Sequence, residues 1–234
     1  MVTDTKHNNP AAESITQKNA KTMGVSAKVN KKNVFQYQRL VIEMLVGGPY
    51  KDHPYGHVAL RVVAKDKEFI YDFGRYGATW GTFKSEGEGI LNIWTNFSAY
   101  ISEENSLGRV TTGFVYSATD QEINKIIKYF DALIAGKKAR GKSPTKSTYR
   151  IDTDYHALRQ NCTILSVVGV KQAFPDFDKN SKSFIEGRGL GFAEKTAAKF
   201  EGWPNHIFMP ADLQAYLESN KAKPAEKVNK YGGK

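Results

Sequence analysis

A single cysteine in a chain of 234 residues limits how this protein can be stabilised and what chemistry it can carry out. One thiol excludes an internal disulfide and a cysteine-rich zinc site, so stability has to come from a hydrophobic core. With 40% hydrophobic residues, the chain is long enough to bury one sizeable core or two small ones. Cys162 is then either an inert buried thiol, as most lone cysteines are, or a reactive one.

The net charge of +10 is concentrated near the two ends of the sequence and in one internal segment. Six lysines face two acidic residues in 1–33, five face one in 221–234, and 137–150 holds six basic residues and no acidic one. Such runs are usually solvated and flexible. We therefore expect a flexible basic arm over 1–33, a single catalytic domain over 34–220 and a lysine-rich disordered tail over 221–234.

The charge distribution also bears on the partners of this chain. No nucleic-acid-binding motif accompanies the basic segments, so we expect no specific nucleic-acid binding, although weak attraction to an anionic polymer is compatible with them. No apolar stretch approaches the roughly 18 residues that span a bilayer. The N-terminal region lacks the apolar centre of a secretory signal, so we expect neither a transmembrane segment nor a signal peptide.

The pattern of apolar residues predicts an α+β domain in which strands come first and the main helices follow. The runs 57–63 and 68–73, joined by a polar turn, predict a β-hairpin. The β-rich run 109–116 predicts a further strand. The period of 36–46 is ambiguous, and this segment is either a helix or a strand.

The clearest predicted helix covers 119–135. Its isoleucine, leucine and phenylalanine residues recur with helical spacing, and Thr119 and Glu122 have the spacing of a capping box. Gly136 stands where a C-terminal cap belongs. Further helices are expected over 163–174, which is largely apolar, and over 210–219.

Cys162 stands at the expected start of the helix over 163–174. The free N–H groups and the dipole of a helix N-terminus favour a thiolate, and Asn161 is a preferred N-cap residue. Thiolate chemistry also needs a nearby base. The sequence has five histidines, and His57 has a rigid setting because it begins a predicted strand directly after Gly56.

Three short motifs together resemble a known family. They are GHVALRV at 56–62, IYDFG at 70–74 and NCT at 161–163. Their order is similar to that of the circularly permuted papain-like hydrolases, which are related to NlpC-type cell-wall peptidases. The resemblance covers residues 50–175. It implies a permuted papain-like fold, with an antiparallel sheet that carries His57 packed against a helix that has Cys162 at its N-terminus.

The resemblance also implies how the catalytic residues divide the chemistry. His57 would accept the thiol proton, and Cys162 would attack a carbonyl carbon. A third residue would orient the histidine, and Asp72 suits this task because its strand is expected to pair with that of His57. His156 and Asn161 are the alternatives for this third residue.

Several residues near these motifs are candidates for binding a substrate. Tyr76 and Trp80 lie in a glycine-rich loop and offer flat apolar surface for a cleft wall. The other candidates are Tyr71, which would point to the opposite face of its strand from Asp72, Asn161 and His156. The basic loop 137–146 could attract an anionic substrate. We expect no cofactor and no metal site, because one cysteine and scattered histidines give no zinc-binding spacing.

The resemblance implies a peptidase or amidase that acts on stem peptides of bacterial peptidoglycan. Without a signal peptide, such an enzyme would be made in the cytoplasm and exported by a non-Sec route to the periplasm of a target cell. Antibacterial toxins delivered by type VI secretion fit this description, and their partners would be a cognate immunity protein and a component of the secretion machine. Two alternatives remain open: an acyltransferase, thioesterase or protein-modifier hydrolase on the same fold, or a non-enzymatic module that binds anionic polymers.

Overall fold

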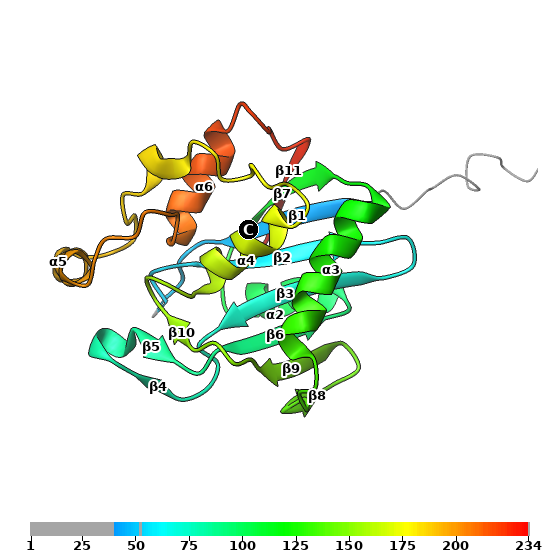
Figure 1. Cartoon of the computed structure of the whole chain (residues 1–234), viewed down its shortest axis with the longest axis horizontal. Coiled ribbons are helices and arrows are strands. Elements are labelled where there is room, and N and C mark those ends of the chain that lie inside the picture. Colours follow the sequence, from blue (N-terminus) through cyan, green and yellow to red (C-terminus); the bar gives the residue numbers. More distant parts are fainter. Residues whose placement is uncertain (1–39, 52, 234) are drawn as a thin grey trace, which may run out of the picture. The chain divides into compact units, whose positions relative to one another are not determined.

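The computed structural model describes residues 40–51 and 53–233, which form an α+β fold around an eight-stranded sheet (Figure 1). The strands of this sheet are β1 (Val41–Gly47), β2 (His57–Val63), β3 (Glu68–Gly74), β6 (Ile90–Trp94), β7 (Thr111–Ser117), β8 (Gly141–Lys142), β9 (Lys146–Arg150) and β11 (Lys227–Tyr231). Their order is β11-β7-β1-β2-β3-β6-β9-β8, and neighbouring strands are antiparallel. The predicted α+β class is confirmed, whereas the expected arm over 1–33 lies outside the described residues.

A smaller sheet and several helices complete the described part of the chain. The small sheet has the order β10-β5-β4, formed by β4 (Thr79–Trp80), β5 (Glu86–Gly87) and β10 (Tyr155–His156). The helices are α2 (Phe97–Ser106), α3 (Asp120–Ile134), α4 (Cys162–Lys171), α5 (Phe192–Phe200) and α6 (Pro210–Ser219), with short 3-10 turns η1 (Thr82–Lys84) and η2 (Ser181–Phe184). Over 40–51 and 53–233, none of these helices has both the length and the apolar character needed to cross a membrane.

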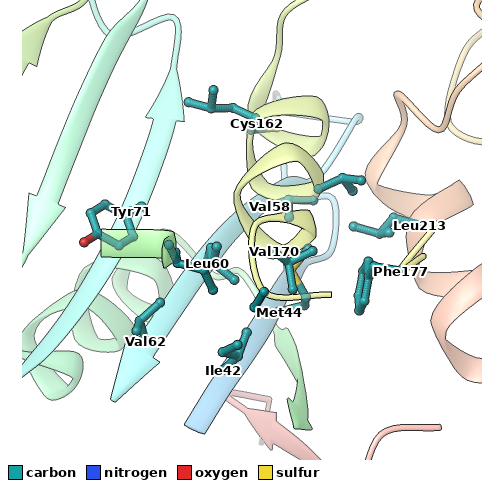
Figure 2. Packing of buried hydrophobic residues seen from close by; sticks show 14 of the residues in the cluster. Ile42, Met44, Val58, Leu60, Val62, Tyr71, Cys162, Val170, Phe177 and Leu213 are labelled. Carbon is teal, nitrogen blue, oxygen red and sulfur yellow. The ribbon is translucent and has the colours of Figure 1, made fainter. Parts of the chain in front are cut away.

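Helices cover both faces of the large sheet. Helices α3, α4 and α6 pack on one face, where Val58, Leu60 and Val62 of β2 belong to the main hydrophobic cluster (Figures 1 and 2). Helix α2 packs on the other face, where Ala59 joins a smaller cluster that includes Tyr100. Because successive side chains of a strand point to opposite faces, β2 contributes to both clusters.

The first three strands of the chain, β1 to β3, follow the sequence pattern closely. The predicted hairpin is confirmed as β2 and β3, and its register pairs Ala59 with Asp72 and Leu60 with Tyr71. The segment of ambiguous period forms β1, which lies between β2 and β7. A buried position between two strands explains why β1 is apolar on both faces and shows no clear alternation.

The clearest predicted helix is confirmed as α3. The Thr119 hydroxyl accepts a hydrogen bond from the backbone N–H of Glu122 at 3.2 Å, and the Glu122 carboxylate accepts one from the N–H of Thr119 at 2.8 Å. Gly136, with a φ of 72°, adopts the left-handed conformation that commonly follows a helix. The buried residues of this helix are Ile123, Ile126 and Phe130.

The expectation of a disordered tail over 221–234 is wrong for its central part. Lys227–Tyr231 form strand β11, which pairs with β7 along its whole length. Asn229 Nδ2 and the Tyr231 hydroxyl donate hydrogen bonds to Glu43 Oε1, at 3.0 and 2.7 Å. Asn229 and Tyr231 have the spacing of residues on one face of a strand, but the surrounding lysines led the segment to be interpreted as a tail.

The basic loop 137–146 is also more ordered than a solvated linker. It contains β8 and the first residue of β9, and these two strands form a hairpin. Three of its basic side chains form ion pairs: Lys137 with Asp152, Arg140 with Glu88, and Lys146 with Glu103. These pairs offset part of the positive charge that was expected to attract an anionic substrate.

Candidate active site

His57 is the first residue of β2, and the residue before it fixes this placement. Gly56 has a φ of 75°, and a Cβ atom at this position would lie 2.6 Å from the carbonyl oxygen of Gly47. Both the left-handed conformation and the close approach favour glycine over any other residue. The side chain of His57 therefore begins from a fixed point at the end of the sheet, and the residue is only 8% exposed.

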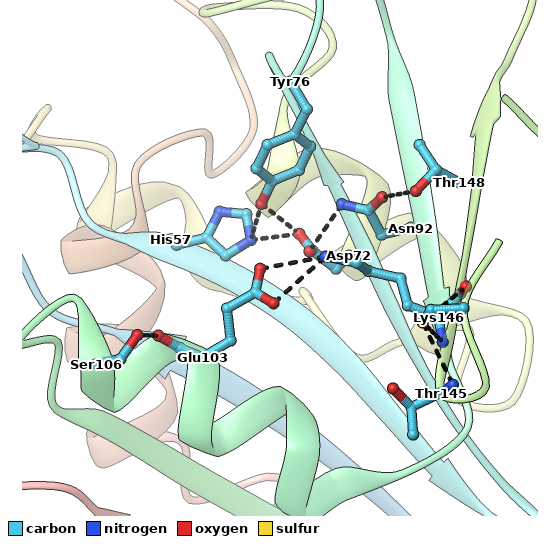
Figure 3. Close-up of polar contacts among 10 residues, drawn as sticks. His57, Asp72, Tyr76, Asn92, Glu103, Ser106, Thr145, Lys146 and Thr148 are labelled. Carbon is cyan, nitrogen blue, oxygen red and sulfur yellow. Dashed lines mark hydrogen bonds and ion pairs between the residues drawn. The ribbon is translucent and has the colours of Figure 1, made fainter. Parts of the chain in front are cut away.

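A row of polar side chains extends from His57 across the sheet (Figure 3). His57 Nε2 lies 2.6 Å from Asp72 Oδ1, and Asn92 Nδ2 donates a hydrogen bond to Asp72 Oδ2 at 3.2 Å. The Thr148 hydroxyl in turn donates to Asn92 Oδ1 at 2.8 Å. The register accounts for this row, because Asp72 is paired with Asn92, and Asn92 with Thr148, on neighbouring strands. The Asp72 carboxylate is thus held on one side while it faces the imidazole on the other.

Cys162 is the first residue of α4, as predicted, and is 7% exposed. The Asn161 side chain caps this helix, since its Oδ1 accepts a hydrogen bond from the N–H of Ile164 at 3.0 Å. Its Nδ2 donates to the carbonyl oxygens of Ala157 at 2.6 Å and Phe208 at 2.9 Å. Asn161 therefore fixes the start of the helix and, with it, the position of the thiol.

Cys162 and His57 lie close enough for the charge of each to shift the pKa of the other. Because Asp72 faces Nε2 of the ring, Nδ1 is the nitrogen left for the sulfur. His57 consequently lies between a thiol and a carboxylate. This is the order in which a nucleophile, a base and an orienting acid have to stand.

Burial and charge act in opposite directions on the pKa of each of these groups. Burial raises the pKa of the Cys162 thiol, but the charge of His57 and its hydrogen bond outweigh burial, and the pKa is lowered. Burial lowers the pKa of His57, but the charges of Asp72 and Cys162 raise it well above its usual value. Burial raises the pKa of Asp72, but the charge of His57 and its hydrogen bond outweigh burial, and the pKa is lowered. The site therefore favours a thiolate beside an imidazolium.

Tyr76 joins this site from the loop that follows β3. The residue is 53% exposed, yet its hydroxyl donates a hydrogen bond to Asp72 Oδ1 at 2.8 Å and lies 3.4 Å from His57 Nε2 (Figure 3). Burial of this hydroxyl, followed by the charge of Asp72, raises the pKa of Tyr76 well above its usual value. The sequence predicted Tyr76 as a cleft wall, whereas its contact with Asp72 was not predicted.

The prediction that Tyr71 binds substrate is wrong. Tyr71 lies on the opposite face of β3 from Asp72, is 2% exposed, and stacks on Phe130 of α3 with ring centroids 3.8 Å apart. Figure 2 shows it among the buried residues of the main cluster. Because the ring is enclosed between the sheet and α3, it stabilises the fold and cannot contact a substrate.

The remaining predicted residues are placed around the site and not in it. Trp80 is exposed on β4, where its indole N–H donates to Glu86 at 3.3 Å. His156 Nδ1 accepts a hydrogen bond from the N–H of Leu158 at 3.1 Å, and its Nε2 lies 3.9 Å from Glu201. Neither of them contacts Asp72 or Cys162, and their binding of substrate stays a prediction. Asn161 acts as the helix cap described above.

Sequence reasoning missed Asn92 and Thr148. Asn92 stands in the apolar strand ILNIW and is buried, and a buried amide needs hydrogen-bond partners. That isolated polar residue was the signal that could have been followed. No comparable signal marks Thr148, because its importance arises only from the pairing of β6 with β9.

A small open pocket, with a volume of about 90 Å³, is lined by segments that neighbour the site residues in sequence. Its apolar lining includes Leu158, Phe208 and Met209. Tyr55 lines it two residues before His57, and Arg75 lines it three residues after Asp72. Cys162, His57 and Asp72 themselves do not line this pocket.

Neither a metal site nor a related protein identifies the kind of site that these residues form. Among the described residues, no group of three histidine, cysteine, aspartate or glutamate side chains could hold a metal ion. Comparisons with protein-family models, with curated proteins and with solved structures find no match for this chain. The site is a buried arrangement of a cysteine, a histidine and an aspartate, built where a helix begins and a strand begins.

Proposed function

We propose that this chain is a cysteine hydrolase in which Cys162 is the nucleophile and His57 is its base. The observation that carries the proposal is the 2.6 Å contact of His57 with Asp72, together with the electrostatic interaction between His57 and the Cys162 thiol at the start of α4. Burying ionisable groups costs free energy, and a structural thiol gains nothing from a neighbouring imidazole and carboxylate. Groups with shifted pKa values that converge beside a pocket are typical of active sites.

In the proposed reaction, the Cys162 thiolate attacks the carbonyl carbon of an amide and forms a tetrahedral intermediate. The imidazolium of His57 then donates its Nδ1 proton to the leaving amine, and a thioester remains on the sulfur. Water attacks this thioester while His57 accepts a proton from it, which releases the carboxylic acid and restores the thiolate–imidazolium pair. Asp72 keeps the ring in one orientation and stabilises its positive charge.

The start of α4 is suited to stabilise the oxyanion of the tetrahedral intermediate. The first N–H groups of a helix have no acceptor within the helix. Asn161 uses the N–H of Ile164, which leaves those of Cys162 and Thr163 for the oxyanion. The dipole of the helix favours the same negative charge.

The arrangement also supports the proposed family and substrate. A histidine on an antiparallel sheet, packed against a helix that begins with a cysteine, resembles a circularly permuted papain-like fold of the NlpC type. On this likeness we propose that the substrates are amide bonds in stem peptides of bacterial peptidoglycan. The proposal includes action as an antibacterial toxin that reaches the periplasm of a target cell by a non-Sec route such as type VI secretion, with a cognate immunity protein that blocks the site.

The proposal is tested by digesting purified peptidoglycan with the wild type and with Cys162→Ala, and by measuring product masses. We expect cleaved stem peptides with the wild type and a loss of roughly 10³-fold or more in the variant. His53→Ala is a matched control, because the His53 ring stacks on Tyr50 at 4.7 Å and takes no part in the site. This control should cleave like the wild type.

Other outcomes separate the parts of the proposal. Cleavage by Cys162→Ala at the wild-type rate would refute the nucleophile. If the wild type cleaves nothing but Cys162 reacts rapidly with iodoacetamide at about pH 6, the thiol chemistry stands and the cell-wall substrate is refuted. Lipid, thioester and protein-modifier substrates would then be tested. A thiol that is unreactive at this pH would refute the enzyme itself.

A further inference from the structure

Arg75 has a charge that the described part of the chain does not neutralise. Its guanidinium lies over the ring of Tyr155, with 5.4 Å from Cζ to the ring centroid, and no carboxylate among the described residues lies within ion-pair distance of it. Most other arginines of the fold are paired, as Arg61, Arg109 and Arg140 show. An unpaired guanidinium in a half-buried position is suited to bind an anion.

The pocket beside Arg75 offers an apolar surface on its other side. Leu158, Phe208 and Met209 are buried, belong to one hydrophobic cluster, and line this pocket. Two glutamates also line the pocket. Glu194 accepts hydrogen bonds from the Tyr55 hydroxyl and the Gly191 N–H. The second one, Glu201, lies near His156. The pocket therefore combines an apolar floor with one cation, Arg75, and two carboxylates, neither of which forms an ion pair with it.

Hydrogen bonds of Asn161 connect this pocket to the residue that precedes the thiol. Asn161, the residue directly before Cys162, holds the carbonyl groups of Ala157 and Phe208, which both line the pocket. Tyr155, on which Arg75 is placed, is close enough to Cys162 to be affected by the charge of the thiolate. A molecule whose carbonyl carbon lies at the sulfur can therefore extend into the pocket.

We propose that Arg75 determines specificity by binding a carboxylate of the substrate, while an apolar part of the same substrate occupies the pocket lined by Leu158, Phe208 and Met209. This inference rests on the proposed function, because it assumes that Cys162 reacts with the bound molecule. It names the substrate class as an amide that bears a free carboxylate next to an apolar group. A planar guanidinium can hold such a carboxylate through two parallel hydrogen bonds.

The first test uses the thiol itself and requires no knowledge of the natural substrate. Iodoacetate and iodoacetamide alkylate Cys162 by the same displacement of iodide, but only iodoacetate carries a carboxylate. We measure the ratio of their rate constants in the wild type, Arg75→Gln, Arg75→Lys and Arg159→Gln. Because Cys162 is the only cysteine, each rate reports on this site alone.

We expect the iodoacetate-to-iodoacetamide ratio to fall roughly threefold or more in Arg75→Gln at low ionic strength. Arg75→Lys should retain most of the ratio, since it keeps the charge. Arg159→Gln is the matched control, because Arg159 is exposed and donates to the carbonyl of Glu201 at 3.1 Å. An unchanged ratio in Arg75→Gln, or an equal fall in Arg159→Gln, would overturn the inference.

The second test compares stem peptides with free carboxylates and the same peptides after their carboxylates are converted to methylamides. Arg75→Gln should raise KM about tenfold for the free peptides with little change in kcat, and should leave the methylamides unaffected. Equal effects on both forms would show that Arg75 does not contact the carboxylate. Failure of the proposed function is distinguishable, because it appears as a thiol that reacts with neither alkylating reagent.

Discussion

The two faces of the large sheet differ in what they contribute to the protein. On the face covered by α3, α4 and α6, the strands present apolar side chains such as Val58 and Leu60, which are completely buried. On the opposite face, the same strands present the polar residues His57, Asp72 and Asn92, which are also buried, beside the smaller apolar cluster that includes Ala59 and Tyr100.

One strand can therefore contribute both to the stability of the fold and to the chemistry of the site. Along β2, every second residue belongs to the core and the residues between them belong to the polar row or its surroundings. Loss of side-chain volume on the core face lowers the stability of the fold, because the interior is closely packed. Loss of a hydrogen-bond partner on the polar face leaves a buried polar group unsatisfied. We therefore expect substitutions on the core face to change the free energy of unfolding, and substitutions on the polar face to change the reactivity of Cys162.

The largest effect is expected from His57→Gln, which keeps a hydrogen-bond donor for Asp72 but cannot become a cation. Burial, the largest cause, raises the pKa of the Cys162 thiol, and removing the imidazolium takes away the two largest causes that oppose it. We expect hydrolysis to fall roughly 10³-fold or more, and iodoacetamide alkylation at about pH 6 to fall with it. The pH profile of alkylation checks this, since the thiolate should form only at a higher pH than in the wild type. A profile that does not move would show that His57 does not activate the thiol.

A smaller effect, of the opposite kind, is expected from Leu60→Ala on the core face. Leu60 is completely buried, and its loss leaves a cavity between the sheet and α4, so the free energy of unfolding should fall by about 2–5 kcal/mol. Chemical denaturation measures this change. Where the variant is folded, the pH profile of Cys162 alkylation should match that of the wild type. A shifted profile would mean that the two faces are not independent.

The smallest effect is expected from Tyr76→Phe, which removes one hydrogen bond to Asp72 and leaves the ring in place. That hydrogen bond is one of the causes that lower the pKa of Asp72. In the variant, Asp72 should therefore become protonated at a higher pH than in the wild type. The contribution of ionised Asp72 is present above its unfolded pKa and is lost as the pH falls through its folded pKa. The acid limb of both alkylation and stability should therefore move upward by less than about one pH unit. An unchanged acid limb would show that Tyr76 does not act through Asp72.

The sequence predicted those parts of the site that depend on local patterns. Asn161 before an apolar run indicated a helix start, and this placed Cys162 at the first position of α4. Glycine before a β-rich run indicated that His57 begins a strand, and alternation placed Asp72 and Tyr71 on opposite faces of the next one. Listing Tyr71 with the substrate-binding candidates nevertheless failed, because burial under α3 depends on how a distant helix packs.

Other parts could not be predicted because they depend on pairing between distant segments. Asn92 and Thr148 are 56 residues apart, and only the register of β6 and β9 joins them. The α5 helix was missed as well, and only Ala198 of its residues is buried. Strand β11 was missed because it lies in a lysine-rich segment and is recognised only by its pairing with β7.

Strand β11 has a consequence for how copies of this chain behave toward one another. It is the outermost strand on one side of the large sheet, and β8, only two residues long, is outermost on the other. An outermost strand offers unpaired backbone groups to any extended segment of another molecule, and charged side chains discourage such pairing. The exposed side chains of Lys227 and Lys230 supply that charge. The two lysines thus disfavour pairing of this edge with another molecule, and removal of β11 would make β7 the outermost strand.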